Sequence, residues 1–147
     1  MGKIIIVGAN GSIGKASAQI LRSQNRDIEI ISRNKDELSI NASELNCSSQ
    51  VIDISNLSHV DKYIQQIDFD IEGIIFAVGS IMLKPFEQTT MSEFESTYKQ
   101  NFLDPIYFTQ QAIKKMSNSS SIVYFSTVAA KSGFKLHTAI ASAKSAL

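Results

Sequence analysis

Lys3-Ile4-Ile5-Ile6-Val7-Gly8-Ala9-Asn10-Gly11-Ser12-Ile13-Gly14 is the stretch that decides how the rest of the chain is interpreted. Its run of four β-branched residues, 4–7, predicts a fully buried β-strand. Three glycines at intervals of three residues follow, and residues 15–21 are typical of a helix. Such a turn can hold a phosphate, because unpaired N–H groups and the helix dipole face an anion. An ordinary strand-to-helix turn is the alternative.

The bulk properties of the chain exclude several classes of protein. With 147 residues it is long enough for one domain, 1–147, with a sizeable core. Its formal net charge of zero argues against a nucleic-acid partner, and no segment has the length of a membrane span. The single cysteine, Cys47, excludes an intrachain disulfide and fits a reducing compartment. No secretory signal is visible, so we expect a cytoplasmic protein without membrane or nucleic-acid partners, and no metal site.

Strands and helices alternate along the chain. After the first strand, the apolar segments 27–32, 49–52, 73–79 and 121–126 predict four more. Ser55 or Ser58 is expected to cap a helix between the third and fourth strands. A helix rich in alanine and serine begins near Thr138 and is predicted to continue to Leu147.

A long helix with a kink is predicted between the fourth and fifth strands. Thr90 and Glu93 have the spacing of a capping box, which opens a helix that extends to about Met116. Pro105 lies inside this helix and removes one backbone hydrogen bond, so the helix should bend near Asn101.

Strands that are apolar on both faces and alternate with helices predict a parallel sheet covered on both sides. With right-handed crossovers the expected fold is α/β, a Rossmann-type doubly wound sheet with strand order 3-2-1-4-5. A nucleotide would bind across the carboxyl ends of the first and fourth strands, where the order reverses. The glycine turn lies at this point, which favours the phosphate site over the ordinary turn.

The end of the second strand indicates which nucleotide is preferred. NAD-binding folds usually place there an acidic residue that binds the ribose 2′-hydroxyl, whereas this chain has Ser32-Arg33-Asn34. A guanidinium pairs with a 2′-phosphate that a carboxylate would repel, so we predict NADP(H) in preference to NAD(H). A solvated arginine at the end of a strand is the alternative. A P-loop is excluded, because no Gly-Lys-Ser/Thr follows the glycines.

Over residues 3–147 the chain resembles the short-chain dehydrogenase/reductase family. The resemblance depends on short segments in a fixed order, which are Gly8 to Gly14, Ser32-Arg33-Asn34, Asp53-Ile54, Ala77-Val78-Gly79, Asn101, Ser126-Thr127 and Ala143-Lys144. It implies an oxidoreductase that transfers hydride between a nicotinamide and a small carbonyl or alcohol substrate.

The resemblance also implies a set of cofactor contacts. These are Gly8, Asn10, Gly11, Ser12, Ile13, Gly14, Ser32, Arg33, Asn34, Asp53, Ile54, Ala77, Gly79 and Lys144. The glycine turn would hold the pyrophosphate, and Asp53 resembles the acidic residue that accepts from the adenine amino group. An aspartate in a turn before a helix is the alternative for Asp53. Gly79 and Lys144 would lie beside the nicotinamide ribose, although the asparagine that usually precedes this glycine is absent.

The family's catalytic residues are only partly retained. The family uses a serine, a tyrosine as acid/base, and a lysine four residues after the tyrosine. Lys144 places the tyrosine position at Ile140, which exchanges no proton, and the serine position at Thr127, which keeps a hydroxyl. Asn101 matches a helix asparagine that supports a kink and a proton relay. His137 is a candidate replacement donor, with a solvated or capping histidine as the alternative.

The family continues beyond the last helix into segments that close over the substrate, whereas this chain stops at Leu147. We therefore expect a domain truncated after the helix that follows the fifth strand, either as a fragment or as a relative that completes itself as a homo-oligomer. Three functions remain open. They are an NADP(H)-linked oxidoreductase with an altered proton donor, a non-catalytic NADP(H)-binding module that acts as sensor or partner-binding protein, and a truncated relative without function.

Overall fold

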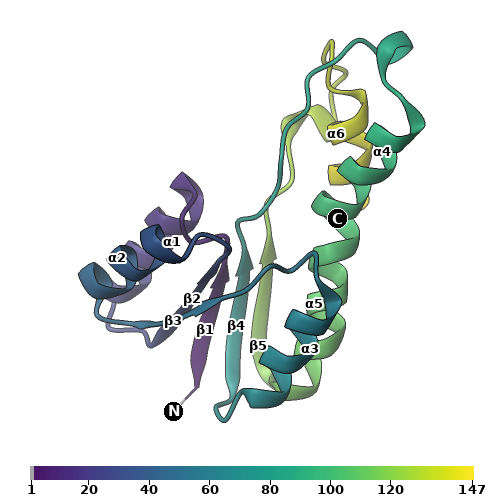
Figure 1. Cartoon of the computed structure of the whole chain (residues 1–147). Coiled ribbons are helices and arrows are strands. Elements are labelled where there is room, and N and C mark those ends of the chain that lie inside the picture. Colours follow the sequence, from purple (N-terminus) through teal and green to yellow (C-terminus); the bar gives the residue numbers. More distant parts are fainter. Residues whose placement is uncertain (1) are drawn as a thin grey trace.

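A five-stranded parallel sheet forms the centre of the computed structural model, which describes residues 2–147 (Figure 1). Its strands are β1 (Lys3–Val7), β2 (Ile28–Ser32), β3 (Ser48–Val51), β4 (Ile71–Phe76) and β5 (Met116–Tyr124). They are arranged β3-β2-β1-β4-β5, and every neighbouring pair is parallel. The predicted doubly wound α/β sheet with strand order 3-2-1-4-5 is confirmed.

Helices cover both faces of this sheet. On one face lie α1 (Ser12–Ser23) and α2 (Lys35–Leu45), and on the other lie α3 (Leu57–Gln66) and α5 (Asp104–Ala112) (Figure 1). Two more helices, α4 (Met91–Tyr98) and α6 (Thr138–Ser145), pack together beyond the carboxyl ends of the strands. Within residues 2–147, every helix falls short of the length and apolarity that crossing a membrane requires.

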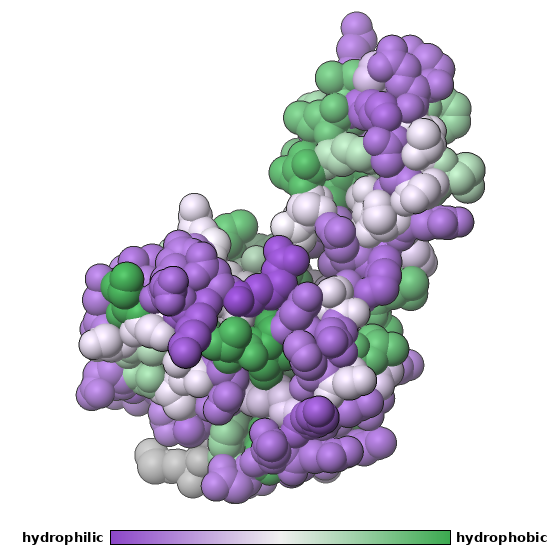
Figure 2. All heavy atoms as spheres, viewed as in Figure 1, coloured by the Kyte–Doolittle hydropathy of each residue, from purple (hydrophilic) through white to green (hydrophobic). Residues whose placement is uncertain are grey.

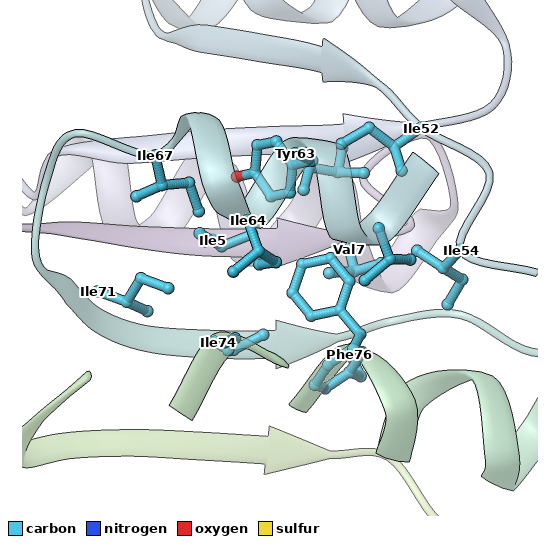
Figure 3. Close-up of a cluster of buried hydrophobic side chains, with 14 residues drawn as sticks. Ile5, Val7, Ile52, Ile54, Tyr63, Ile64, Ile67, Ile71, Ile74 and Phe76 are labelled. Atoms are coloured by element: carbon cyan, nitrogen blue, oxygen red, sulfur yellow. The ribbon is translucent and has the colours of Figure 1, made fainter. Parts of the chain in front are cut away.

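The β-branched residues of β1 contribute side chains to two hydrophobic cores, one on each face of the sheet. Ile5 and Val7 point into the larger core, between the sheet and the α3–α5 layer (Figure 3). Ile6, between them, points to the opposite face and packs with Ala18 of α1 and Leu38 of α2. Successive side chains of a strand alternate between faces, so a strand covered on both sides needs an unbroken apolar run.

The long helix predicted after Thr90 is divided in two by a π-helical turn. Thr90 and Glu93 form both hydrogen bonds of the predicted capping box at the start of α4. Residues Lys99–Leu103 form the π-turn, and α5 follows with Pro105 in its first turn. Because proline has no N–H and its ring opposes the carbonyl of Asn101, the wider turn accommodates it without breaking the helix. The structure therefore has a π-turn at the position near Asn101 where the sequence predicted a kink.

Several predicted boundaries are wrong by a few residues. The cap of α3 is Asn56, whose side chain accepts from the N–H groups of Ser58 and His59, rather than Ser55 or Ser58 itself. Beyond α5 only the 3-10 turn Ile113–Lys115 intervenes, so β5 begins at Met116 instead of residue 121. Residues 117–121 are polar and were not recognisable as strand, but the Ser120 hydroxyl donates to the Ile71 carbonyl of β4 at 2.6 Å.

Other boundaries also differ by one to three residues, among them the end of β4 and the end of α6. β4 ends at Phe76, because residues 77–79 leave the sheet as the loop that follows it. α6 ends at Ser145 rather than Leu147, since the Ala146 N–H bonds three residues back to the Ala143 carbonyl and tightens the last turn.

Phe108 of α5 provides a test of the larger core. Its side chain is completely buried, and its ring lies edge-on to Phe76 with centroids 5.5 Å apart. We expect Phe108→Ala to lower the free energy of unfolding by about 3–5 kcal/mol, measured by urea denaturation. Phe86→Ala is the matched control, because that ring is 66% exposed, and it should cost less than about 1 kcal/mol. Equal losses for the two variants would contradict this assignment of the core.

Candidate functional site

A cavity of about 270 Å³ opens at the carboxyl ends of β1 and β4, where the strand order reverses. Of the predicted cofactor residues, Gly8, Asn10, Gly11, Ser32, Arg33, Asp53, Ile54, Ala77 and Gly79 line it. Ser12, Ile13, Gly14, Asn34 and Lys144 lie outside its lining. The sequence therefore identified most of the cavity, since the loops that follow β1, β2, β3 and β4 supply most of its lining residues.

The glycine turn brings backbone rather than side chains to the cavity. Gly8 has φ +88°, and a Cβ there would lie 2.7 Å from the Ala77 carbonyl oxygen. At Gly14, in the first turn of α1, a Cβ would lie 2.8 Å from the Ala9 Cα and would overlap the Gly8 carbonyl oxygen. These two glycines are needed for the close contact of β1, β4 and α1.

The N-terminus of α1 is open to a ligand. Its N-cap, Gly11, provides no side-chain cap, and no acidic residue lies in the first turn. Its first N–H groups therefore have no side-chain acceptor from the cap, and the positive end of the helix dipole is not neutralised. Gly11 lines the cavity, so the arrangement suits an anion held by backbone N–H groups.

The β2–α2 junction forms a second wall of the cavity. Arg33 is exposed and lines it, and among residues 2–147 no carboxylate forms an ion pair with its guanidinium. Asn34, the next residue, caps α2 by accepting from the Glu37 N–H. The acidic residues Asp36 and Glu37 lie in the first turn of α2 and do not line the cavity. The cavity therefore has a free guanidinium at this wall.

Asp53 follows β3 and combines the two roles considered for it. Its carboxylate accepts from the N–H of Ser55 at 3.0 Å and from the hydroxyl of Ser55 at 2.8 Å, as a turn residue would. It also lines the cavity. Burial opposes its ionisation, but the hydrogen bonds from Ser55 outweigh this effect and lower the pKa of Asp53. The residue is an anionic acceptor at the edge of the cavity.

Asn101 connects the π-turn to the loop after β4. Its side chain is fully buried, and its oxygen accepts from the Ser80 N–H at 3.3 Å. Its amide nitrogen donates to the carbonyls of Thr97 (2.9 Å) and Ser80 (3.3 Å). A Cβ on Gly79 would lie 2.6 Å from the Asn101 oxygen, so the glycine permits this contact. Asn101 therefore fixes the position of the loop that ends the cavity.

Lys144 of α6 reaches the same loop. Its Nζ donates to the Val78 carbonyl at 3.4 Å, and it would lie 3.4 Å from a Cβ on Gly79. The side chain is half-buried, and burial lowers its pKa. Among residues 2–147 no carboxylate pairs with it. An unpaired, partly buried cation with unused donors beside a cavity is typical of a functional group.

The other predicted catalytic positions lie outside the cavity lining. Thr127 accepts from the Ala129 N–H at 3.3 Å and caps a short 3-10 turn. The His137 ring bonds to the Lys135 carbonyl through Nδ1 and packs on Phe134, with centroids 5.6 Å apart. Ile140, at the position of the family's tyrosine, is 4% exposed. In residues 2–147 no three His, Cys, Asp or Glu side chains are grouped to hold a metal ion.

Sequence reasoning missed Asp104, a cavity-lining carboxylate that is 3% exposed. Lys99 pairs with it at 2.5 Å and also donates to the Ser55 carbonyl at 3.2 Å. The sequence offers no distinct signal for this role, because an aspartate next to a proline is typical of an ordinary helix start. Without the π-turn, Lys99 and Asp104 are five residues apart and do not share a helix face.

Beyond the cavity, apolar side chains gather on the part of the molecule formed by α4, α6 and the loops before them (Figure 2). The exposed ones there include Ile81, Leu83, Met91, Phe134 and Leu136. The two loops are joined by the Lys84 N–H, which donates to the Leu136 carbonyl at 3.0 Å.

Comparison with known proteins places this geometry in a family. The family model described as short chain dehydrogenase matches residues 2–147. An uncharacterized oxidoreductase of Staphylococcus aureus is 26% identical over 138 residues, which cover 90% of this chain and 59% of the relative. The 3-ketodihydrosphingosine reductase of Mus musculus is 25% identical over 159 residues, covering 98% of this chain and 48% of the relative.

Solved structures share the fold. A short-chain type dehydrogenase/reductase from Mycobacterium ulcerans superposes with a TM-score of 0.90 at 21% identity, covering 99% of this chain and 58% of the other. A short-chain dehydrogenase/reductase from Brucella melitensis gives 0.91 at 21% identity, covering 99% and 62%. This chain spans 59% of the Staphylococcus aureus relative and 48% of the mouse relative.

Gly14 and Gly11 offer a matched test of the glycine turn. We expect Gly14→Ala to destabilise the protein by about 2–3 kcal/mol, because the new Cβ meets backbone that cannot move aside. Gly11→Ala should be tolerated within about 1 kcal/mol, since its nearest contact would be 3.5 Å. Thermal unfolding followed by circular dichroism compares the two variants. A destabilised Gly11→Ala beside an unaffected Gly14→Ala would contradict the described packing.

Proposed function

The chain belongs to the short-chain dehydrogenase family, and from that premise we propose that it binds NADP(H) in the cavity between β1 and β4. There it transfers hydride between the nicotinamide and a carbonyl or alcohol substrate. One observation carries the proposal: the open N-terminus of α1, the guanidinium of Arg33 and the loop of Gly79 border a single cavity, and Asn101 and Lys144 bond to that loop.

The residues present fit a dinucleotide. Gly8 and Gly11 line the cavity where a pyrophosphate would approach, and the α1 N-terminus supplies N–H donors. Asp53 is ionised at neutral pH because its pKa is lowered, so its carboxylate can accept from an adenine amino group. Gly79 lines the cavity and lies beside Lys144, where a ribose would bind.

The preference for NADP(H) is supported by the β2–α2 junction. Ser32 stands where a carboxylate would repel a 2′-phosphate, and Arg33 beside it has no ion-pair partner among residues 2–147. Two parallel N–H groups of a guanidinium can donate charge-assisted hydrogen bonds to two oxygens of one phosphate.

Lys144 and Asn101 organise the reacting end of the site. When bound, the nicotinamide supplies or accepts the hydride. Lys144 binds the ribose hydroxyls and holds a proton at Nζ beside Gly79, where Ile140 cannot provide one. We therefore assign to Lys144 the proton that the family's tyrosine gives to the substrate oxygen. Asn101 holds the loop that carries Gly79 in place through its bonds to Ser80.

The substrate class is proposed from the surface next to this cluster. Exposed apolar side chains on α4, α6 and their loops, including Ile81 and Phe134, suit a carbonyl compound with an apolar part. Two of the similar proteins are 3-ketodihydrosphingosine reductases by name, one of them fused to a second protein in Schizosaccharomyces pombe. An apolar ketone is therefore the first substrate to test.

The cofactor preference is tested by titrating the protein with NADPH and NADH. We expect NADPH to bind at least about tenfold more tightly, and Arg33→Ala to reduce this ratio by about tenfold, because one charge-assisted contact is worth about 1.5–3 kcal/mol. Lys35→Ala is the control, since Lys35 is also exposed but does not line the cavity. Equal affinities in the unmodified protein would contradict the role of Arg33.

The reaction is tested with NADPH and a panel of ketones and aldehydes. We expect Lys144→Met to lower kcat/KM by a factor of about 10²–10⁴, and exposed Lys131→Met to leave it unchanged. Reduction needs the protonated ammonium, so the rate should be full below the lowered pKa of Lys144 and fall as pH rises through it. Lys144→Met should lose this pH dependence. A protein that binds NADPH but oxidises none of it across the panel overturns the proposed reaction.

A further inference from the structure

One side chain of the glycine turn is bonded to α2 at two points. Asn10 donates from Nδ2 to the Asn34 carbonyl at 3.2 Å, and its Oδ1 accepts from Nδ2 of Asn41 at 3.1 Å. Asn34 is the N-cap of α2, and Asn41 lies seven residues further along, about two helical turns. Asn10 lines the cavity, whereas Asn41 does not.

The burial of Asn41 has no explanation in packing alone. Asn41 is only 3% exposed. Its neighbours along α2, Leu38 and Ala42, pack in the apolar core on the α1–α2 face of the sheet. A buried amide costs free energy unless it is hydrogen-bonded, so a leucine would serve the core better. Among residues 2–147, the bond to Asn10 is the one hydrogen bond that the Asn41 side chain makes. The polar residue is therefore explained by its contact with the glycine turn.

The direction of this bond fixes the orientation of the Asn10 amide. The Nδ2 group of Asn41 can only donate, so it selects the oxygen of Asn10. The Nδ2 of Asn10 is then turned toward the Asn34 carbonyl, which can only accept. Without Asn41, the bond to the Asn34 carbonyl alone would hold the Asn10 amide. The two bonds together hold the glycine turn at a set distance from the junction that carries Arg33.

We infer that Asn41 is a positioning residue for the adenosine end of the dinucleotide, acting through Asn10. The inference rests on the proposed function, in which the glycine turn holds the pyrophosphate and Arg33 holds the 2′-phosphate. These two phosphates are attached to the same ribose, which limits their separation, so their binding sites must match that limited range. Asn41 contributes to affinity and cofactor preference without touching the ligand.

Adenosine 2′,5′-bisphosphate is the probe for this inference, and its dissociation constant is measured by titration calorimetry. We expect Asn41→Leu, which keeps the volume and removes the donor, to weaken binding by about five- to tenfold, as for one lost hydrogen bond. Ser43→Ala, on an exposed position of the same helix, is the matched control and should bind as the unmodified protein does. If Asn41→Leu does not fold, Asn41→Ala replaces it, and thermal melting verifies the fold of each variant.

A double-mutant cycle separates positioning from a general structural role. If Asn41 acts through Asn10, the effect of Asn41→Leu disappears in the Asn10→Ala background, so the two losses are not additive. Additive losses, or undiminished binding by Asn41→Leu, overturn the inference and leave the proposed function standing. An unmodified protein that binds neither adenosine 2′,5′-bisphosphate nor NADPH overturns the proposed function itself.

Discussion

The close contact of bare backbone at Gly8 and Gly14 is the constraint on which the rest of the structure depends. α1 can begin directly above β1 only because no Cβ separates its first turn from the Gly8 carbonyl. That contact places the helix N-terminus at the reversal point of the sheet, between β1 and β4. The N-cap is Gly11, which has no side chain to accept from the first N–H groups of α1, so these groups remain available to an anion at this point.

A second constraint acts at the opposite end of the cavity. Pro105 cannot occupy an ordinary helix, and the π-turn that accommodates it turns Asn101 toward the loop after β4. The bonds between Asn101 and Ser80 then hold Gly79 beside Lys144. The way the helix accommodates Pro105 thus determines how Asn101, Gly79 and Lys144 lie relative to one another.

The sequence predicted the sheet and most of the cavity because both depend on local patterns. The β-branched run of β1, the glycine spacing and the Thr90–Glu93 capping box each act over a few residues. The start of β5 and the pair of Lys99 with Asp104 could not be predicted, since they depend on the bulge opposite Ile71 and on the π-turn. Contacts between segments far apart in the chain, such as Asn41 with Asn10, leave no periodic signal.

The charges of the cavity show how a polyanion can be accommodated beside two carboxylates. Asp104 is buried in the lining, where an unpaired carboxylate would repel a phosphate strongly, but Lys99 pairs with it and neutralises it locally. Asp53 is engaged by Ser55, whose carbonyl is bonded to the same lysine. The two carboxylates are thus joined in one network through Lys99, and the Arg33 guanidinium also contributes to the lowered pKa of Asp53. Arg33 lines the cavity and Lys144 lies outside its lining beside Gly79, both without an ion-pair partner among residues 2–147, so two separate cations are available to a long anionic ligand.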